Sequence, residues 1–522
     1  MREFNVTGLC IPKRHYMVDI SGKLAQIRAM VDKGNYFTIN RGRQYGKTTT
    51  LFLLQKMLKD EYIVLSLSFE DIGGKCFESE VAFCRTFMRL VHRALQFTDV
   101  ADEYREGWLN EAVDGFASLG NHITNMCRDK KLVLMIDEVD KSSNNKVYLY
   151  FLGMLRGKYL RQAQEADHSF HSVILAGVYD IRNIKQKMIS EGVYSPTATE
   201  DKIYNSPWNI ATSFDVDMSF SSDEIASMLT AYEAEHDSGM DIPAVADEIY
   251  AFTSGYPFLV SRICQCIDKE PGKDWTPQGI GEAVQIILGE KNLLFDDIIK
   301  NLENNQTLYN FLYGLLVTGN GNGFNIYNPV INLGHMYGFL KQGERRQTVV
   351  SNRMFEILMY EYFISNDTIP KKRISGVLQE DVVDGGRFDM ELCLRKFAEH
   401  YAEIFNERDA EFIEREGRLL FLSYLKPLIN GQGFYHMESQ LTDLRRMDLV
   451  VDFGDEQFII ELKLWKGEAA HEKAYEQLAG YLDSKGAQVG YLVTFDFSKG
   501  MNKQPYAKWV DFEDKQIFDV VI

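Results

Sequence analysis

The chain has 522 residues, of which 45% are hydrophobic and 25% are charged, and its formal net charge at pH 7 is −18. One hydrophobic core does not serve a chain of this length, so the composition predicts a folded protein of about two to four domains. The negative charge argues against a protein that coats nucleic acid over its whole surface, although a local basic groove remains compatible with it.

The sequence lacks the signals of export and of membrane insertion. No apolar run approaches the roughly 18 residues that cross a bilayer, and residues 1–5 lack the apolar core of a signal peptide. Seven cysteines in so long a chain do not form a disulfide framework. Cys264 and Cys266 have neither a second pair nor a histidine group to complete a metal site. We therefore expect a cytoplasmic protein without a membrane partner.

Short apolar runs alternate with helix-period segments over the first 220 residues. The segments at 48–58 and 81–95 predict helices, and the apolar runs predict strands at 36–40, 62–69, 132–137, 173–178 and 214–220. Strands that alternate with helices predict an α/β fold with a parallel sheet covered by helices on both faces.

The pattern changes at Ser221, which caps a predicted helix whose first turn carries the acids Asp223 and Glu224. A mainly helical segment follows to residue 302. Beyond it come two helical patterns, a hydrophobic turn at 337–340, a β-like run at 348–351 and a helix at 354–363, an order that suits a winged helix-turn-helix. The glycine-rich run at 319–323 predicts a surface loop.

A polar segment at 366–373 is the best linker candidate, and a different pattern follows it. Residues 390–429 and 468–482 predict helices, and strands are predicted at 447–453, 457–464 and 489–495. We therefore divide the chain into four domains, at residues 1–220, 221–302, 303–368 and 369–522.

A candidate phosphate-binding loop follows the first predicted strand and opens the next helix. It consists of Gly42, Arg43, Gln44, Tyr45, Gly46, Lys47, Thr48 and Thr49. In this context backbone N–H groups and the helix N-terminus face the anion, Lys47 reaches the outer phosphates, and the Thr48 hydroxyl binds Mg²⁺. Arg41 stands where such loops usually have glycine, and we expect Gly42 to supply the backbone freedom one residue later.

Two acids end the predicted strand at 132–137. Asp137 at the strand tip would hold Mg²⁺ through water, and Glu138 would polarise the attacking water. An acid pair after a strand can also be a turn or the cap of the next helix. The order of the two motifs favours an ATP site. Asp140 and Lys141 continue the loop after the acid pair.

These residues resemble the AAA-like ATPases of prokaryotes, in the branch of archaeal-type and STAND signalling ATPases. The resemblance covers residues 1–363 and includes a sensor-strand segment at 175–182, a lid segment around Gly255 and Pro257, and the end of a winged-helix module at 351–356. It implies that the proline reports which nucleotide is bound. Three arginines are candidates for a finger or sensor, with a surface helix position as the alternative for each: Arg156, Arg161 and Arg182.

A second constellation lies in the last 80 residues. Glu461 and Lys463 share one face of a predicted strand, and a hairpin partner can bring Asp448 beside Glu461. Two carboxylates and the Leu462 carbonyl would form a hard oxygen site for Mg²⁺ or Mn²⁺. Lys463 would orient the attacking water and stabilise charge on a scissile phosphate. A solvent-facing ion pair would show the same Glu-x-Lys pattern.

This arrangement is similar to the PD-(D/E)XK nuclease family, with Met447 in place of the usual proline before Asp448. Gln477 and Tyr481 are four apart on a predicted helix, and the pair resembles the Gln-x-x-x-Tyr element of the exonuclease-like branch. The resemblance also implies an upstream acid, for which Glu438 and, less well, Glu416 are available. Arg445 and Arg446 would contact backbone phosphates, or else form a solvated basic turn.

The hypothesis from sequence is an ATPase whose nucleotide state controls a metal-dependent nuclease acting on DNA, with a homo-oligomer as an open possibility. Family resemblance implies defence against foreign DNA or DNA processing. Two alternatives remain open: a switch whose C-terminal domain binds nucleic acid or a partner without cleaving it, and a scaffold that retains bound nucleotide.

Overall fold

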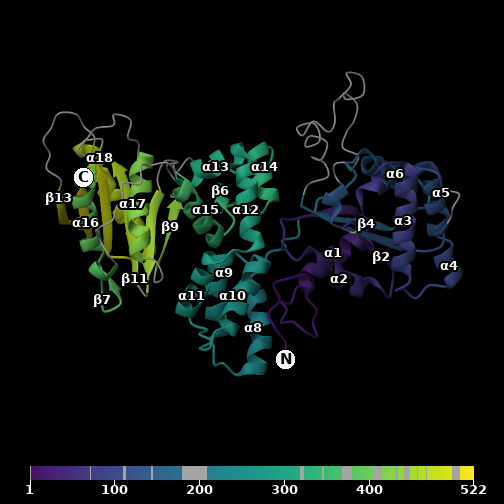
Figure 1. Cartoon of the computed structure of the whole chain (residues 1–522), viewed down its shortest axis with the longest axis horizontal. Helices are drawn as coiled ribbons and strands as arrows, with labels where there is room; N and C mark the ends of the chain where they lie inside the picture. Colours follow the sequence, from purple (N-terminus) through teal and green to yellow (C-terminus); the bar gives the residue numbers. More distant parts are fainter. Residues whose placement is uncertain are drawn as a thin grey trace, which may run out of the picture. The chain divides into compact units, whose positions relative to one another are not determined.

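The computed structural model of the chain, drawn in Figure 1, describes residues 2–70, 72–109, 113–142, 145–178, 208–317, 323–343, 346–366, 379–404, 414–429, 433–439, 447–454, 456–465, 467–496 and 506–522. The chain divides into two compact units. The first comprises Met1–Tyr250, Gly255–Gln265 and Met336–Gly338. The second comprises Ala251–Ser254, Cys266–His335 and Phe339–Ile522.

A four-stranded parallel sheet forms the centre of the first unit, in the order β1-β4-β3-β2. Its strands are β1 (Tyr36–Asn40), β2 (Ile63–Ser68), β3 (Leu132–Asp137) and β4 (Ser172–Gly177). Every residue of β3 and β4 is buried, which explains why both strands are unbroken apolar runs in the sequence.

Helices cover both faces of this sheet, as predicted. Alternate strand residues such as Phe37, Met135 and Ile174 pack with α1 (Ser21–Asp32) and α2 (Lys47–Leu58). The other set, which includes Tyr36 and Leu134, packs with α3 (Glu80–Leu95), α5 (Phe116–Cys127) and α6 (Lys146–Ala163). Shorter elements complete the unit's first part: η1 (Gly74–Phe77), α4 (Asp102–Glu106) and η2 (Val139–Ser142).

The predicted strand at 214–220 is wrong. The apolar residues that predicted it are in part buried, as Val216 and Met218 show. The segment nevertheless has no ladder, and the described residues just before it make an isolated parallel bridge to β1, between Thr212 and Phe37. The Val216 carbonyl accepts a hydrogen bond from the Arg41 guanidinium instead of from a strand. Apolar residues therefore identified a buried face but not the backbone pairing.

Helices dominate the middle of the chain. Ser221 accepts from the Glu224 N–H while the Glu224 carboxylate accepts from the Ser221 N–H, which confirms the predicted helix start. The helices are α8 (Ser222–His236), α9 (Ile242–Thr253), α10 (Pro257–Lys269), α11 (Pro277–Gly289), α12 (Leu293–Asn304), α13 (Gln306–Val317), α14 (Pro329–Met336) and α15 (Arg353–Asn366). An antiparallel hairpin of β5 (Leu340–Gln342) and β6 (Thr348–Val350) lies between the last two. The predicted loop at 319–323 lies, apart from Gly323, outside the described residues.

A six-stranded mixed sheet forms the C-terminal part of the second unit, in the order β13-β14-β12-β11-β10-β9. The strands are β9 (Gly433–Ser439), β10 (Met447–Phe453), β11 (Glu456–Leu464), β12 (Val489–Phe495), β13 (Tyr506–Phe512) and β14 (Lys515–Val521). Three of them were predicted, at β10, β11 and β12. The small elements η3 (Gln379–Asp381), β7 (Val383–Asp384) and β8 (Arg387–Phe388) precede the sheet.

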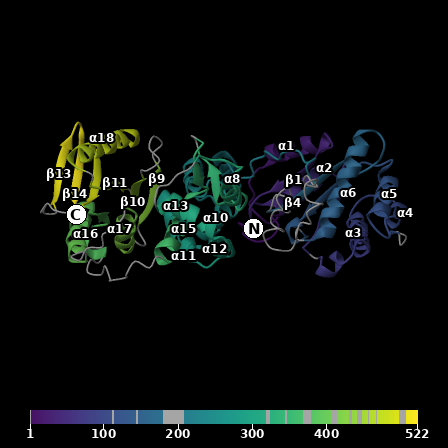
Figure 2. The same cartoon turned by 90° about the horizontal axis from the view of Figure 1, so that it is seen from above.

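Helices lie on both faces of this sheet as well. Figure 2 shows α18 (Glu468–Lys485) along one face, with α16 (Met390–Ile404) and α17 (Glu414–Ile429) on the other. Ala474, Leu478 and Leu482 of α18 pack on a strip of sheet residues: Val450, Ile459, Leu492 and Ile517. Because side chains alternate along a strand, Glu461 and Lys463 lie on the same face as Ile459, under α18. None of the helices in the described part of the chain is long and apolar enough to cross a membrane.

Candidate functional sites

The loop between β1 and α2 wraps around a buried lysine. Gln44 and Gly46 have positive φ values of 59° and 74°, which turn the backbone into α2. Lys47, only 8% exposed, donates from Nζ to the carbonyl oxygens of Arg41 and Gly42, both at 2.9 Å. Burial lowers the pKa of Lys47, and the nearby Asp140, Glu138 and Asp137 oppose that shift. The loop thus holds a cation at its centre, at the N-terminus of a helix, which suits a phosphate anion.

The two predicted acids stand at the carboxyl end of β3. The Thr48 hydroxyl donates to Asp137 Oδ2 at 2.6 Å, and Asp137 Oδ1 accepts from the Glu138 N–H at 2.9 Å. Burial, followed by the charge of Asp137, raises the pKa of Glu138. The hydroxyl and carboxylate oxygens brought together here are the hard ligands that Mg²⁺ takes. Their chemistry therefore fits a Mg-nucleotide.

Gly42 is required by a close approach rather than by an unusual backbone angle. A Cβ at this position would lie 2.7 Å from the Tyr337 carbonyl oxygen, and Gly42 is not among the residues with positive φ. The expectation that Gly42 supplies backbone freedom is therefore wrong; Gln44 and Gly46 supply it. The Arg41 side chain is used nearby, where it donates to the Val216 carbonyl at 2.9 Å and lies over the Phe214 ring.

The segment at the start of α10 also contacts the loop. The Tyr256 hydroxyl donates to the Arg43 carbonyl, and its ring meets the Tyr45 ring edge-on at 4.4 Å. A Cβ at Gly338 would lie 3.2 Å from the Tyr45 ring. Tyr256 and residues 336–338 therefore form a cover on the phosphate loop within the first unit. Sequence reasoning identified the Gly-x-Pro segment but not Tyr337.

Other predicted residues around this loop have different surroundings. The Thr49 hydroxyl accepts from the Cys10 N–H at 3.2 Å, so it is bound to the N-terminal segment. Asp140 accepts from the Val178 N–H just beyond β4. Nothing is described of the Lys141 side chain.

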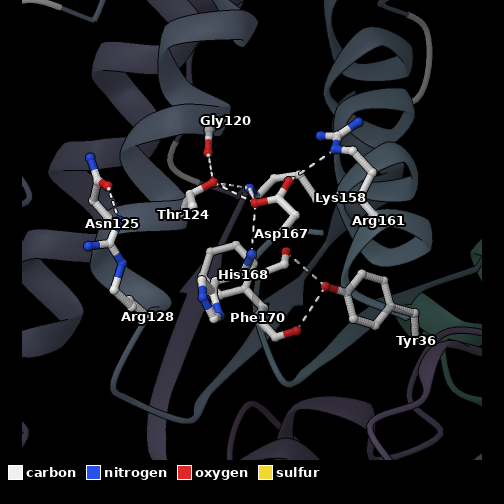
Figure 3. A network of polar contacts seen from close by, with 11 residues as sticks. Tyr36, Gly120, Thr124, Asn125, Arg128, Lys158, Arg161, Asp167, His168 and Phe170 are labelled. Atoms are coloured by element: carbon white, nitrogen blue, oxygen red, sulfur yellow. Dashed lines mark hydrogen bonds and ion pairs between the residues drawn. The ribbon is translucent and has the colours of Figure 1, made fainter. Parts of the chain in front are cut away.

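The three candidate arginines for a finger or sensor differ in their surroundings. Arg161 lies 3.1 Å from Asp167, just before the amino end of β4 and therefore at the sheet edge opposite the phosphate loop (Figure 3). Arg156 donates to the Asn209 side chain at 2.6 Å. Arg182 lies outside the described residues. Within one chain, Arg161 is therefore remote from the phosphates.

The hairpin expected in the C-terminal domain is present, and its register brings the acidic positions together. Asp448 of β10 pairs with Glu461 of β11, and on its other side it pairs with Glu438 of β9. Glu461 is 2% exposed, and its Oε1 lies 2.5 Å from Lys463 Nζ. The acidic positions and the lysine thus occupy neighbouring places on three strands. Nothing is described of the side chains of Asp448 and Glu438.

The remaining predicted residues of this site divide between core and surface. Tyr481 is buried and belongs to the core cluster that includes Val450 and Ile459, whereas Gln477 is half-buried. The Leu462 side chain is buried, so only its backbone carbonyl is available as a ligand. Arg445 and Arg446 lie outside the described residues, as does the Glu416 side chain. Among the residues described, no group of three or more His, Cys, Asp or Glu side chains is gathered as a metal site.

Sequence reasoning missed a polar cluster on the same sheet face. His471 and Tyr475 of α18 and Tyr506 of β13 surround Asp519 of β14. The available signal was the apolar run at residues 517–522, which Asp519 interrupts.

Comparison with protein families gives two matches. The model of the AAA-like domain matches residues 13–273, and the model of the PD-(D/E)XK nuclease superfamily matches residues 433–504. No curated protein matches the chain.

Three solved structures illustrate the likeness at low identity. A Walker-type ATPase of Pyrococcus abyssi has 9% identity and a TM-score of 0.48, over 68% of this chain and 99% of that one. Cdc6p of Pyrobaculum aerophilum has 13% identity and a TM-score of 0.31, over 69% and 97%. The ORC2 protein of Aeropyrum pernix has 9% identity and a TM-score of 0.36, over 69% and 98%.

Proposed function

The chain belongs to the family of the AAA-like domain and carries a PD-(D/E)XK nuclease domain, and from that membership we propose that it is an ATPase whose nucleotide state controls DNA cleavage. The observation that carries the proposal is the presence in one chain of a phosphate loop around Lys47 and a strand register that pairs Asp448 with Glu461.

In the first site, ATP would bind with Mg²⁺ at the loop of residues 42–49. Lys47 would exchange its two carbonyl partners for phosphate oxygens, because a charge-assisted bond to an anion is stronger than a bond to a neutral carbonyl. Thr48 and Asp137 would hold the metal, and Glu138 would orient and polarise the attacking water. The raised pKa of Glu138 supports that last role, since a base works best when its pKa approaches the working pH.

In the second site, Asp448, Glu461 and the Leu462 carbonyl would hold Mg²⁺ or Mn²⁺. A bound divalent ion would supply Lewis-acid stabilisation of the scissile phosphate and lower the pKa of a bound water. Lys463 would then leave Glu461 for the water or the phosphate, and its side chain, 20% exposed, has the freedom to do so. Gln477 and Tyr481 would flank this site from α18.

Two contacts on the phosphate loop support control by nucleotide. Tyr256 and Tyr337 touch the loop, and their segments continue directly into residues of the second unit at Ser254 and Phe339. Within that second unit, Lys341 donates to the Ser254 hydroxyl at 2.9 Å. A nucleotide that displaces Tyr256 and Tyr337 from the loop would therefore move chain segments that continue into the second unit.

Arg353 is the residue that would carry this movement to the nuclease strand. Its guanidinium lies 4.8 Å from the Phe252 ring centre and pairs with Asp452 of β10, the strand that also carries Asp448. Gln457 of β11 donates to the same carboxylate at 2.7 Å. A shift at Phe252 would thus reach the hairpin that holds the acidic positions.

The proposal also includes finer points that were predicted from the sequence. The chain divides into domains at 1–220, 221–302, 303–368 and 369–522, with a winged helix as the third. The substrate is DNA, and the activity serves defence against foreign DNA in the cytoplasm.

The decisive experiment measures cleavage of linear, circular and single-stranded DNA and of RNA, with Mg²⁺ or Mn²⁺, with and without ATP. Wild-type protein should cut DNA, and Asp448→Ala should not. Lys47→Ala should abolish phosphate release, and Glu138→Ala should reduce it while ATP binding persists. Lys59→Ala, an exposed lysine after α2, is the matched control.

Each alternative has its own outcome in that experiment. Protein that releases phosphate but leaves every nucleic acid intact would be a switch without nuclease activity. Protein that binds ATP without releasing phosphate would be a scaffold.

Arg353→Ala tests the control step by itself. The variant should keep ATP hydrolysis and metal-dependent cleavage but lose most of the difference between cleavage rates with and without ATP. Arg387→Ala, an exposed arginine in the same unit, should keep that difference. An unchanged ATP response in Arg353→Ala would refute this route.

A further inference from the structure

A second buried acid stands in the same row of the C-terminal sheet as Glu461. The register runs from Glu461 through Leu492 to Asp519, so the two acids are separated by one apolar residue. The next row runs from Lys463 through Thr494. Because paired positions of a sheet share a face, all of these side chains lie on the face that α18 covers.

Asp519 is fully buried and receives three partners on one oxygen. Its Oδ2 lies 2.7 Å from the Tyr475 hydroxyl, 2.9 Å from the Tyr506 hydroxyl and 3.0 Å from His471 Nε2. Burial and the nearby Asp519 carboxylate raise the pKa of both tyrosines, so their hydroxyls remain donors. Asp519 Oδ1 is buried without a hydrogen-bond partner among the described residues.

Burial of a carboxylate has a cost in stability, and the partners of Asp519 offset it. Leu492 is its neighbour across the sheet on the same face, whereas Phe518 and Val520 point to the other face. The acid is therefore matched to the three polar groups around it, and one of these, His471, also lies near Thr494 in the row of Lys463.

His471 connects Asp519 to the surroundings of Lys463. Its Nδ1 lies 3.4 Å from the Thr494 hydroxyl, and its ring centre lies 4.9 Å from that of Trp465. Thr494 is the register partner of Lys463, and Trp465 follows Lys463 by two residues, just beyond the end of β11. With both ring nitrogens near partners, the imidazole is fixed against two neighbours of the lysine.

We propose that His471, oriented by Asp519, is a positioning residue that holds Lys463 in place for phosphodiester cleavage. The catalytic part of this inference rests on the proposed nuclease function. The structural part, that His471 limits the movement of Lys463, does not depend on it. His471 would act through Thr494, the register partner of Lys463, and through the Trp465 ring, and would thereby limit where the lysine ammonium can go. Displacement of a reacting group by about 1 Å can cost a hundredfold in rate.

The first test measures the position of Lys463 without any nuclease assay. The full-length protein is treated with an amine-acylating reagent, and the rate of modification at Lys463 is compared with that at Lys473, which is exposed on α18. Asp519→Asn and His471→Gln should raise the rate at Lys463 at least threefold while the rate at Lys473 stays constant. An unchanged rate at Lys463 would overturn the proposal.

The second test measures cleavage by the same variants. If wild-type protein cuts DNA, Asp519→Asn and His471→Gln should lower kcat about tenfold or more and leave KM unchanged. The double variant His471→Leu with Asp519→Leu removes the polar pair and also the acceptor of the Tyr475 and Tyr506 hydroxyls, so its melting temperature is measured to show that it folds. Its kcat should still be low.

The combined outcomes separate the two proposals. A double variant that is stable and fully active would show that the cluster is structural and would overturn the inference. Wild-type protein that cuts nothing, combined with faster acylation of Lys463 in the variants, would refute the nuclease function and leave the positioning of Lys463 standing.

Discussion

Two pairs of an acid and a lysine in the described part of the chain, one in each unit, differ in how completely the acid is bound. Asp167 in the first unit accepts from Thr124 at 2.6 Å, from the His168 N–H at 2.7 Å, from Lys158 at 2.9 Å and from Arg161 at 3.1 Å (Figure 3). Glu461 in the second unit has Lys463 as its partner among the described residues.

The lysines differ as well. The Lys158 side chain is 1% exposed, whereas that of Lys463 is 20% exposed. A lysine that cannot reach water must keep its acid, and an acid with four donors has little capacity for a ligand. The arrangement around Asp167 therefore favours stability, whereas Glu461 has oxygens left for a ligand and its lysine reaches the surface, as the proposed metal site requires. Burial of an ion pair does not by itself distinguish the two roles.

Asp167→Asn should give the largest effect, a loss of about 3–5 kcal/mol in the unfolding free energy of the first unit. The reason is that Lys158 would remain buried without a carboxylate. Urea denaturation measures the change, with Asp129→Asn on the surface as a control. ATP hydrolysis per folded molecule should not change, and a variant that is stable but inactive would reverse the assignment of this pair.

Glu461→Gln should show the opposite behaviour. DNA cleavage should fall about 100- to 1000-fold, while the unfolding free energy changes by less than about 1 kcal/mol because Lys463 can turn to solvent. Initial cleavage rates and denaturation curves measure the two quantities, with Glu456→Gln on the same strand as a control. A large loss of unfolding free energy with normal cleavage would show that Glu461, like Asp167, serves stability.

Acid should weaken the Asp167 pair over a defined pH range. Burial alone would raise the pKa of Asp167, but hydrogen bonds from Thr124 and Lys158 outweigh it and lower the pKa to about 2. A lowered pKa in the folded state gives stability that is complete above the unfolded value of 3.8 and is lost as the pH falls through about 2. That loss amounts to roughly 2–3 kcal/mol. The stability difference between wild type and Asp167→Asn should therefore shrink from pH 5 to pH 2, and a constant difference would contradict this account.

Arg161→Ala should give the smallest effect. Its side chain is 53% exposed, so its pair with Asp167 should contribute less than about 1 kcal/mol. ATP hydrolysis measured on monomeric protein should also remain normal, because Arg161 lies at the sheet edge remote from Lys47. A strong loss of ATP hydrolysis in the monomeric variant would contradict this account and would support Arg161 as an arginine finger.

The sequence predicted those parts of the fold that apolar runs define. β3 and β4 are fully buried, so their runs are unbroken and easily recognised. β13 was not predicted because its residues are exposed or half-buried, and the order of its side chains carries little signal. The segment at 214–220 misled because burial alternates along it although its backbone forms no ladder.

For the two sites as well, the sequence predicted local motifs but not contacts between distant parts of the chain. The motifs around Lys47 and Glu461 were sufficient to predict both sites, because residues close together in sequence make up each motif. Tyr337 was not foreseeable, because it reaches Gly42 from a distant part of the chain. Asp519 was missed because β14 was not predicted, so no register related it to Glu461.

The close approach of Tyr337 to Gly42 has a consequence for biosynthesis. Closing a loop of roughly 300 residues costs chain entropy, and the cover on the phosphate loop cannot form until Tyr337 has left the ribosome. At roughly 5–20 residues per second, the β1–α2 loop therefore stays uncovered for roughly 15–60 seconds after its own synthesis. A nascent chain would meet cellular ATP with an open loop, and its first nucleotide would already be present when the cover arrives.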